Sequence, residues 1–212
     1  MRVALGLKAH SGWAALVAIG FCAGEFHLID RRRIELGKNQ DIEWPGQPYH
    51  AAEYEPEAQA RAIVKRGIAQ ARRAALKELR AVVKQARAAE HDIVACAVLM
   101  PAAMPDWSIE EILAVHFRMH KAEGVLFPDA LAKAAIACGL SLVAIPEKQL
   151  QAAAEEALPM PPGSAAKKIS ALGKSAGAPW GADQKNAALA AMIALALRDA
   201  GSQDRSHGLR TL

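Results

Sequence analysis

The stretch Val3-Ala-Leu-Gly-Leu-Lys-Ala-His-Ser-Gly-Trp13 decides the fold, because an apolar strand runs into a polar tip and a second apolar run, residues 14–19, follows at once. Large and small residues alternate in the first run, as expected for a strand that buries mainly one face. The tip combines a cation, an imidazole, a hydroxyl and a flexible glycine, namely Lys8, His10, Ser11 and Gly12. Because loops held by rigid strands often carry sites, this tip predicts either an anion-binding site or an ordinary hairpin turn in which side chains satisfy backbone groups.

The order of the remaining segments indicates a mixed sheet covered by helices. Residues 37–56 and 158–180 are rich in proline and glycine and are expected to be connectors. Residues 1–200 are expected to form a single α/β domain with a five-stranded sheet whose first three strands are antiparallel, and 201–212 a flexible polar tail. Strands are predicted over residues 3–7, 14–19, 26–36, 92–101 and 140–145, and helices over residues 57–89, 108–123, 129–137, 149–157 and 183–199.

Composition limits the classes of protein to which the chain can belong. The 212 residues are 52% hydrophobic, which is ample for a substantial core. No uninterrupted apolar stretch reaches transmembrane length, and the N-terminus does not resemble a secretion signal, so no membrane association is expected. The three scattered cysteines favour buried thiols in a reducing cytoplasm, and the net charge of +4 permits an anionic partner.

Three segments resemble the RNase H-like superfamily, and most closely its RuvC-type Holliday-junction resolvase branch. The first is the strand at residues 3–7 with its polar tip. The second is Glu123-Gly-Val-Leu-Phe-Pro-Asp129, which leads into the strand after Gly139. The third is Lys168-Ile-Ser-Ala-Leu-Gly173 followed by Gly181-Ala-Asp-Gln-Lys-Asn186. The resemblance implies an RNase H-like fold and a nuclease site in which clustered carboxylates hold two magnesium ions.

The carboxylates that this resemblance implies are mostly missing. Lys8 stands where the first acid would fall, and a positive ammonium repels a metal ion. The buried central strand, residues 93–100, contains no acid. At the last helix Asp183 remains, but Asn186 occupies the position of the second acid. Magnesium-dependent cleavage is therefore expected to be lost or replaced, and the identity of any cofactor stays open.

The same surface can still bind an anion if the fold is as expected. Its cations suit a phosphate, a carboxylate or a nucleic-acid backbone, and a histidine among them can act as an acid or base. The competing interpretation is a solvated edge strand and an ordinary acid at a helix N-terminus. The ligand-binding candidates are Lys8, His10, Ser11, Arg31, Arg33 and Lys185, and the catalytic candidates are Glu123, His50 and Asp183.

Two helices carry further candidate sites. His116, His120 and Glu123 are spaced by four and three residues, so they share a helical stripe within reach of one metal ion. Exposed histidines also occur on ordinary amphipathic helices, and whether this stripe binds metal stays open. The long helix carries a basic stripe over about five turns, which is either a nucleic-acid surface or a solvated face. This basic stripe comprises Arg66, Arg73, Lys77, Arg80, Lys84 and Arg87.

Three functional hypotheses follow. The first is a cytoplasmic RNase H-like protein that binds DNA, RNA or a phosphorylated ligand, with Arg80 and Lys84 among its contacts. The second is an enzyme of altered chemistry that holds a small anionic substrate with Lys8 and Arg31 and uses His10, His50 or Glu123 as acid or base. The third is a partner-binding protein without catalysis. The substrate and the oligomeric state are not predicted.

Overall fold

One mixed sheet organises the part of the chain that the computed structural model describes, which comprises residues 1–37, 46–161 and 163–207. Its strands are β1 (Arg2–His10), β2 (Trp13–Cys22), β3 (Glu25–Glu35), β4 (Asp92–Met100) and β5 (Ser141–Pro146). The order across the sheet is β3-β2-β1-β4-β5. The first three strands pair antiparallel, whereas β4 runs parallel to β1 and β5 parallel to β4. The predicted five-stranded mixed α/β sheet is confirmed.

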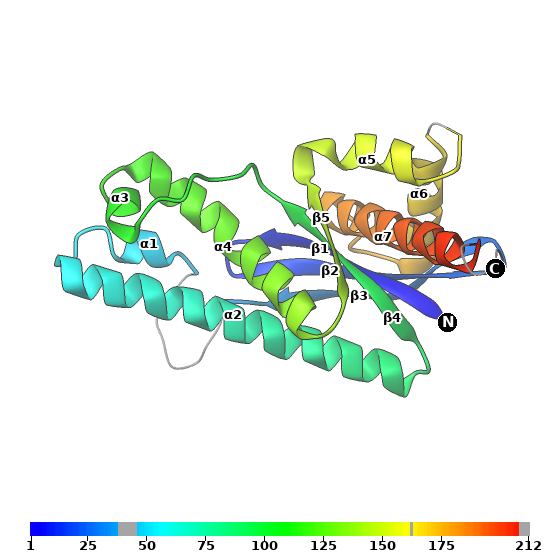
Figure 1. Ribbon diagram of the computed structural model, residues 1–212, viewed down its shortest axis with the longest axis horizontal. Coiled ribbons are helices and arrows are strands. Elements are labelled where there is room, and N and C mark those ends of the chain that lie inside the picture. The colour runs from blue at the N-terminus through cyan, green and yellow to red at the C-terminus, as the bar shows by residue number, and fades with distance from the viewer. Residues whose placement is uncertain (38–45, 162, 208–212) are drawn as a thin grey trace.

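Helices cover both faces of this sheet. Figure 1 shows α2 and α4 on one side and α5, α6 and α7 on the other. The helices are α1 (Pro48–Ala51), α2 (Glu57–Ala88), α3 (Ile109–Leu113), α4 (His116–Ala137), α5 (Leu150–Ala157), α6 (Ser164–Ala176) and α7 (Ala182–His207), with a 3₁₀ turn at Glu147–Gln149. None of the helices within the described residues is long and apolar enough to cross a membrane.

The alternation in β1 decides which helix packs on which face. Val3, Leu5 and Leu7 point into the core beneath α2 and α4, whereas Ala4 points toward α7. On the α7 face Gly6 brings the two backbones together, because a Cβ atom at Gly6 would lie 1.8 Å from the carbonyl oxygen of Ala187. This close approach fixes α7 across β1 at Ala187 and Ala191.

A third apolar cluster lies between the helices α1, α2, α3 and α4. Tyr49 and Ala52 of α1 pack there against Ala60 and Val64 of α2 and against residues of α3 and α4 such as Met119. We call this group the end cluster. Because the end cluster is buried, the short helix α1 has a fixed position although it contains only one turn.

The two helices predicted around Gly124 are placed wrongly. The first of them begins with a capping box, since Ser108 Oγ accepts from the Glu111 amide and the Glu111 carboxylate accepts from the Ser108 amide. The helix then ends after Leu113, because Val115 adopts an extended conformation. The next helix, α4, passes through both Gly124 and Pro128 without interruption.

Tertiary packing explains why α4 continues. A proline ring in a helix collides with the carbonyl group four residues earlier, which here belongs to Gly124. Because Gly124 is exposed, its carbonyl group is free to tilt outward toward solvent. Leu126, Phe127 and Leu131 meanwhile bury the helix in the core.

Two other local expectations are corrected. The segment 158–180 was expected to be irregular, but it contains α6, which begins after Gly163 and buries Ile169. The last helix was expected to end at residue 199, yet α7 continues to His207, because a single glycine weakens a helix without breaking it. Residues 208–212 of the predicted tail, and 38–45 of the predicted connector, lie outside the described residues. The assignment of residues 1–200 to one domain stays a prediction.

The three cysteines are free and differ in accessibility. Cys96 in β4 is fully buried and Cys138 is half-buried, but Cys22 is exposed because it ends β2 at the rim of a hairpin. The prediction of buried thiols is therefore wrong for Cys22. Burial raises the pKa of the Cys96 thiol to about 12 and also raises the pKa of Cys138.

We expect alkylation to follow this order. Because the thiolate is the reactive form, iodoacetamide at neutral pH should modify Cys22 first, Cys138 more slowly and Cys96 only after unfolding. Peptide mass spectrometry over a time course, with and without urea, measures the three rates. Native labelling of Cys96 as fast as that of Cys22 would contradict the burial of β4.

Candidate functional site

The tip between β1 and β2 is a turn held by hydrogen bonds. The carbonyl oxygen of Gly12 accepts hydrogen bonds from the amides of Leu36 and Gly37, at 2.8 and 2.9 Å. Gly12 has φ of +80°, a conformation that favours glycine. Ser11 is exposed at this turn and makes no hydrogen bond to any described residue. The glycine of the tip therefore has a structural role, whereas the Ser11 hydroxyl is free to meet a ligand.

The cations of β1 lie beside carboxylates. Lys8 Nζ lies 2.5 Å from Glu147 Oε2, and His10 Nε2 lies 3.0 Å from Asp183 Oδ1. The His10 ring also stacks on Trp13, with 4.4 Å between centroids. The structure thus places Lys8 beside the turn that follows β5, and His10 beside the first turn of α7. Glu147 therefore offsets the positive charge of Lys8 that an anionic ligand would need.

The arginines of β3 make different contacts. The Arg31 guanidinium donates to the backbone carbonyls of Ala176, Gly177, Ala178 and Pro179. It thereby ties the segment between α6 and α7 to the sheet. Arg33 donates to Glu35 at 2.8 Å and lies 4.1 Å from the centroid of the Trp13 ring. Lys185 is exposed and makes no ion pair within the described part of the chain.

Glu123 and His50 form a second group, built by α4 and α1. The side chain of Glu123 is only 4% exposed, and its Oε1 atom accepts from the amides of Tyr49 and His50 at 2.8 and 3.4 Å. His50 Nδ1 lies 3.5 Å from the same oxygen. Burial raises the pKa of Glu123 to about 7, although the backbone donors oppose this shift. Burial and the neighbouring rings of His120 and His116 lower the pKa of His50.

The predicted site residues therefore fall into two groups. Lys8, His10 and Asp183 lie together at the tip of β1, whereas His50 and Glu123 lie at the end cluster. Among the described residues no hydrogen bond or ion pair joins one group to the other. Glu147, which faces Lys8, was not predicted. It could have been predicted from its position directly after β5, because β5, β4 and β1 run parallel and their carboxyl ends therefore lie at the same end of the sheet.

The basic stripe of α2 is exposed along its whole length. All six cations point away from the buried residues of α2, and none makes an ion pair with another described residue. Neighbouring arginines outside the stripe do: Arg61 pairs with Glu57 and Glu110, and Arg72 lies 3.6 Å from Asp129. The stripe therefore has no cation that a direct ion pair within the described residues neutralises.

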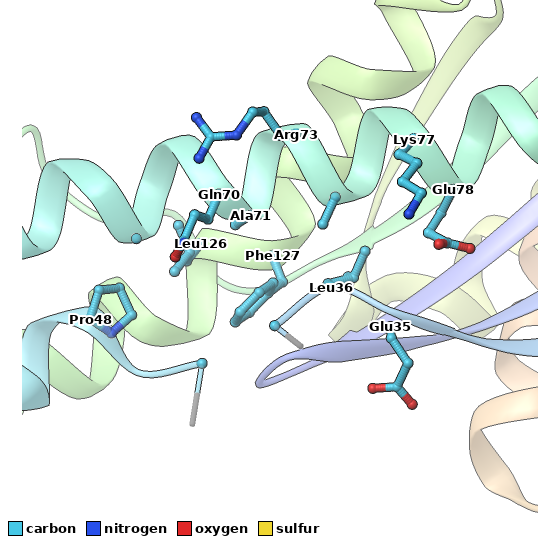
Figure 2. Close-up of a pocket in the computed structure, with 14 residues that line it drawn as sticks. Glu35, Leu36, Pro48, Gln70, Ala71, Arg73, Lys77, Glu78, Leu126 and Phe127 are labelled. Carbon is cyan, nitrogen blue, oxygen red and sulfur yellow. The ribbon is translucent and has the colours of Figure 1, made fainter. Parts of the chain in front are cut away.

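A cavity of about 240 Å³ lies next to the stripe, between α2, α4 and the end of β3. Figure 2 shows Phe127 of α4 and Leu36 near the α2 helix, with Arg73 and Lys77 on α2 itself. Glu35 and Glu78 also line the cavity. Two acids thus balance two cations, so the cavity itself offers no excess positive charge to an anion.

Comparisons with known proteins bear on this fold. No protein-family model matches the sequence, and no curated protein matches it. A structure of RuvC from Thermus thermophilus aligns with a TM-score of 0.50 over 94% of this chain and 96% of RuvC. A second, T. thermophilus RuvC in complex with a Holliday junction substrate, aligns with a TM-score of 0.52 over 95% of this chain and 97% of RuvC. The chain has the RuvC fold. Sequence identity is 14% in both alignments, so the likeness concerns the RuvC fold alone.

The magnesium cluster implied by the RuvC resemblance does not fit the residues at the tip. Magnesium prefers several oxygen ligands, including carboxylates. At this position Lys8 places an ammonium group against Glu147, and the imidazole of His10 lies against Asp183. Asn186 lines a cavity with Glu147 but supplies no negative charge. A RuvC-type metal site is therefore not built by these residues.

Proposed function

We propose that the protein binds nucleic acid through phosphate contacts along the basic stripe of α2, and that it does not cleave the strand by a two-magnesium mechanism. The observation that supports binding is the row of six exposed cations without carboxylate partners among the described residues. Exposed lysine and arginine side chains at regular spacing are the residues that contact phosphates.

The dimensions of the stripe suit a nucleic-acid backbone. From Arg66 to Arg87 the helix rises roughly 32 Å, which corresponds to about nine phosphates on one strand of duplex DNA. A straight helix follows a curved backbone over only part of its length, so we expect fewer than six phosphate contacts. The exposed face of α2 carries no aromatic residue. Base stacking is therefore absent, and binding should depend little on sequence and favour duplex or branched DNA over single strands.

Binding should depend on salt and on the charge of the stripe. The probes are fluorescent four-way-junction DNA, duplex DNA, single-stranded DNA and RNA, measured by anisotropy between about 50 and 200 mM salt. The junction is included because a RuvC structure with this fold contains a Holliday junction substrate. We expect the double variant Arg80→Glu/Lys84→Glu to weaken binding at least about tenfold and to reduce the salt slope by about two.

The matched control changes the same charge on the other side of the sheet. Lys167 and Lys174 of α6 are exposed and make no ion pair with any residue that the structure describes. Lys167→Glu/Lys174→Glu should leave binding nearly unchanged. Equal losses in both double variants would mean that only net charge matters, and an absence of binding at low salt would overturn the proposal. Incubation of the junction with Mg²⁺ should leave the strands intact on a denaturing gel.

An enzyme of altered chemistry is supported by a different observation. Glu123 is a buried carboxyl group whose pKa is raised to about 7, and it lies beside His50. A carboxyl group with such a pKa is suited to acid–base catalysis near neutral pH. A small anionic substrate would need free cations near this pair, whereas Lys8 and Arg31 already contact protein groups elsewhere. We therefore favour nucleic-acid binding, in a cytoplasm that keeps the three thiols reduced. Binding of a protein partner alone is the remaining alternative if no nucleic acid binds.

A further inference from the structure

Three histidines gather at the end cluster, where α1 lies beside the start of α4 (Figure 1). One ring nitrogen from each of His50, His116 and His120 lies within 4.8 Å of the other two. The Nε2 atoms of His116 and His120 are 3.1 Å apart, and their rings meet edge to face with centroids separated by 4.7 Å. Of the three residues of the predicted stripe, His116 and His120 thus come together, whereas Glu123 turns into the core. His50 of α1 takes its place beside the two histidines.

We propose that His50, His116 and His120 bind a transition-metal ion of the Zn²⁺ class. Zn–N bonds are about 2.0–2.1 Å long, so two nitrogens of a tetrahedral site are roughly 3.3 Å apart. The Nε2 atoms of His116 and His120 are already close to this separation. Imidazole ligands suit Zn²⁺, Cu²⁺ or Ni²⁺ and not Mg²⁺ or Ca²⁺, and three protein ligands leave one tetrahedral position for water or another ligand.

Carboxylates behind two of the rings support a metal site. Glu53 Oε1 lies 3.1 Å from Nδ1 of His116, which leaves Nε2 of the same ring facing His120. A carboxylate behind a metal-binding histidine fixes the orientation of its ring and makes it a better ligand. Glu123 is the corresponding neighbour of His50, since it accepts from the His50 amide and lies 3.5 Å from its Nδ1 atom.

The closeness of the three rings explains why this group prefers a metal ion to protons. Three imidazoles so close together repel one another when they are protonated, and a metal binds the neutral form. The side chain of His116 is 60% exposed, so an ion can enter from solvent. Without a metal, His116 and His120 can share a single hydrogen bond, and that is the alternative to be tested.

The site does not depend on nucleic-acid binding, because its residues lie on α1 and the first turns of α4 and not on the basic stripe. A metal ion at this site would link α1 to α4 across the end cluster. A bound ion should therefore stabilise this end of the molecule by linkage, since the unfolded chain does not hold the three rings together.

Metal binding is tested on the tag-free full chain after removal of metals with EDTA. Calorimetric titration with Zn²⁺ should give one ion per chain, and Co²⁺ should give the visible absorption of a tetrahedral site. His116→Gln or His120→Gln should weaken Zn²⁺ binding by more than the roughly 10–100-fold expected when an outer carboxylate is lost. Glu53→Gln should itself weaken binding within that range.

The matched control is His27→Gln, because His27 is an exposed histidine of β3 outside the cluster. It should bind Zn²⁺ as the wild type does. Since the side chains of His116 and His120 point to solvent, their variants should fold, and circular dichroism checks this. Zn²⁺ binding that is unaffected by His116→Gln, or no binding stronger than that of free imidazole, would overturn the proposal and leave a hydrogen-bonded pair of histidines.

Discussion

The variant Gly6→Ala should lose about 3 kcal/mol or more of its free energy of unfolding, with a fall in Tm of about 10 °C. A methyl group at this position would lie 1.8 Å from the Ala187 carbonyl oxygen and 2.9 Å from the Ala191 amide nitrogen. Both atoms belong to the backbone of α7, so no side chain can rotate to make room. The helix must move away from β1, and the core between them must open.

Gly124→Ala is the matched control for this prediction. A Cβ atom at Gly124 would meet no atom within 4 Å, and Gly124 is itself exposed within α4. Because alanine is the better helix former, this variant should gain about 0.5–1 kcal/mol. Urea unfolding followed by circular dichroism measures both free energies. If Gly6→Ala were as stable as the wild type, the packing of α7 on β1 would be wrong.

Glu123→Ala should cost about 2–4 kcal/mol, because it leaves two buried backbone donors without an acceptor and opens a cavity. The donors are the amides of Tyr49 and His50, which Glu123 Oε1 accepts at 2.8 and 3.4 Å. Glu123→Gln retains an oxygen at this position and should lose much less. Urea unfolding in EDTA separates this effect from metal binding. Equal losses for the two variants would show that Glu123 does not hold α1 by hydrogen bonds.

The raised pKa of Glu123 also predicts how the free energies of unfolding of the wild type and of Glu123→Gln change with pH. Burial raises this pKa from 4.5 to about 7, so the folded state binds a proton that the unfolded chain releases between these values. The contribution of Glu123 to stability therefore falls as pH rises through this window. Relative to the wild type, Glu123→Gln should gain stability from pH 5 to pH 8. A constant difference would contradict the raised pKa.

The core of the fold could be predicted from the sequence because it depends on local patterns. Alternation in β1 and the apolar run of β4 mark the centre of the sheet. The basic and the apolar residues of α2 each recur with the period of a helix, so the sequence predicts its two faces. The break before His116 could not be predicted in this way. Ser108 signals where α3 begins, but packing of Leu126 and Phe127 decides that α4 continues through Gly124 and Pro128.

The candidate sites depended on contacts between distant residues. His50 precedes His116 along the chain by a long interval that includes all of α2, so spacing could not join them. The burial of Tyr49 in the end cluster brings His50 to α4. Likewise Arg31 was predicted as an anion ligand from its charge, but only the folded chain places four backbone carbonyls around its guanidinium.

The length of α2 has a thermodynamic consequence. Its first turns belong to the end cluster, through Ala60 and Val64, and its later turns to the main core, through Ala75 and Leu79. A metal ion that fixes α1 to α4 and a nucleic acid that lies along α2 would both restrain helices that pack together in the end cluster. Binding of either would then change the affinity for the other by an equal factor, because such coupling is reciprocal.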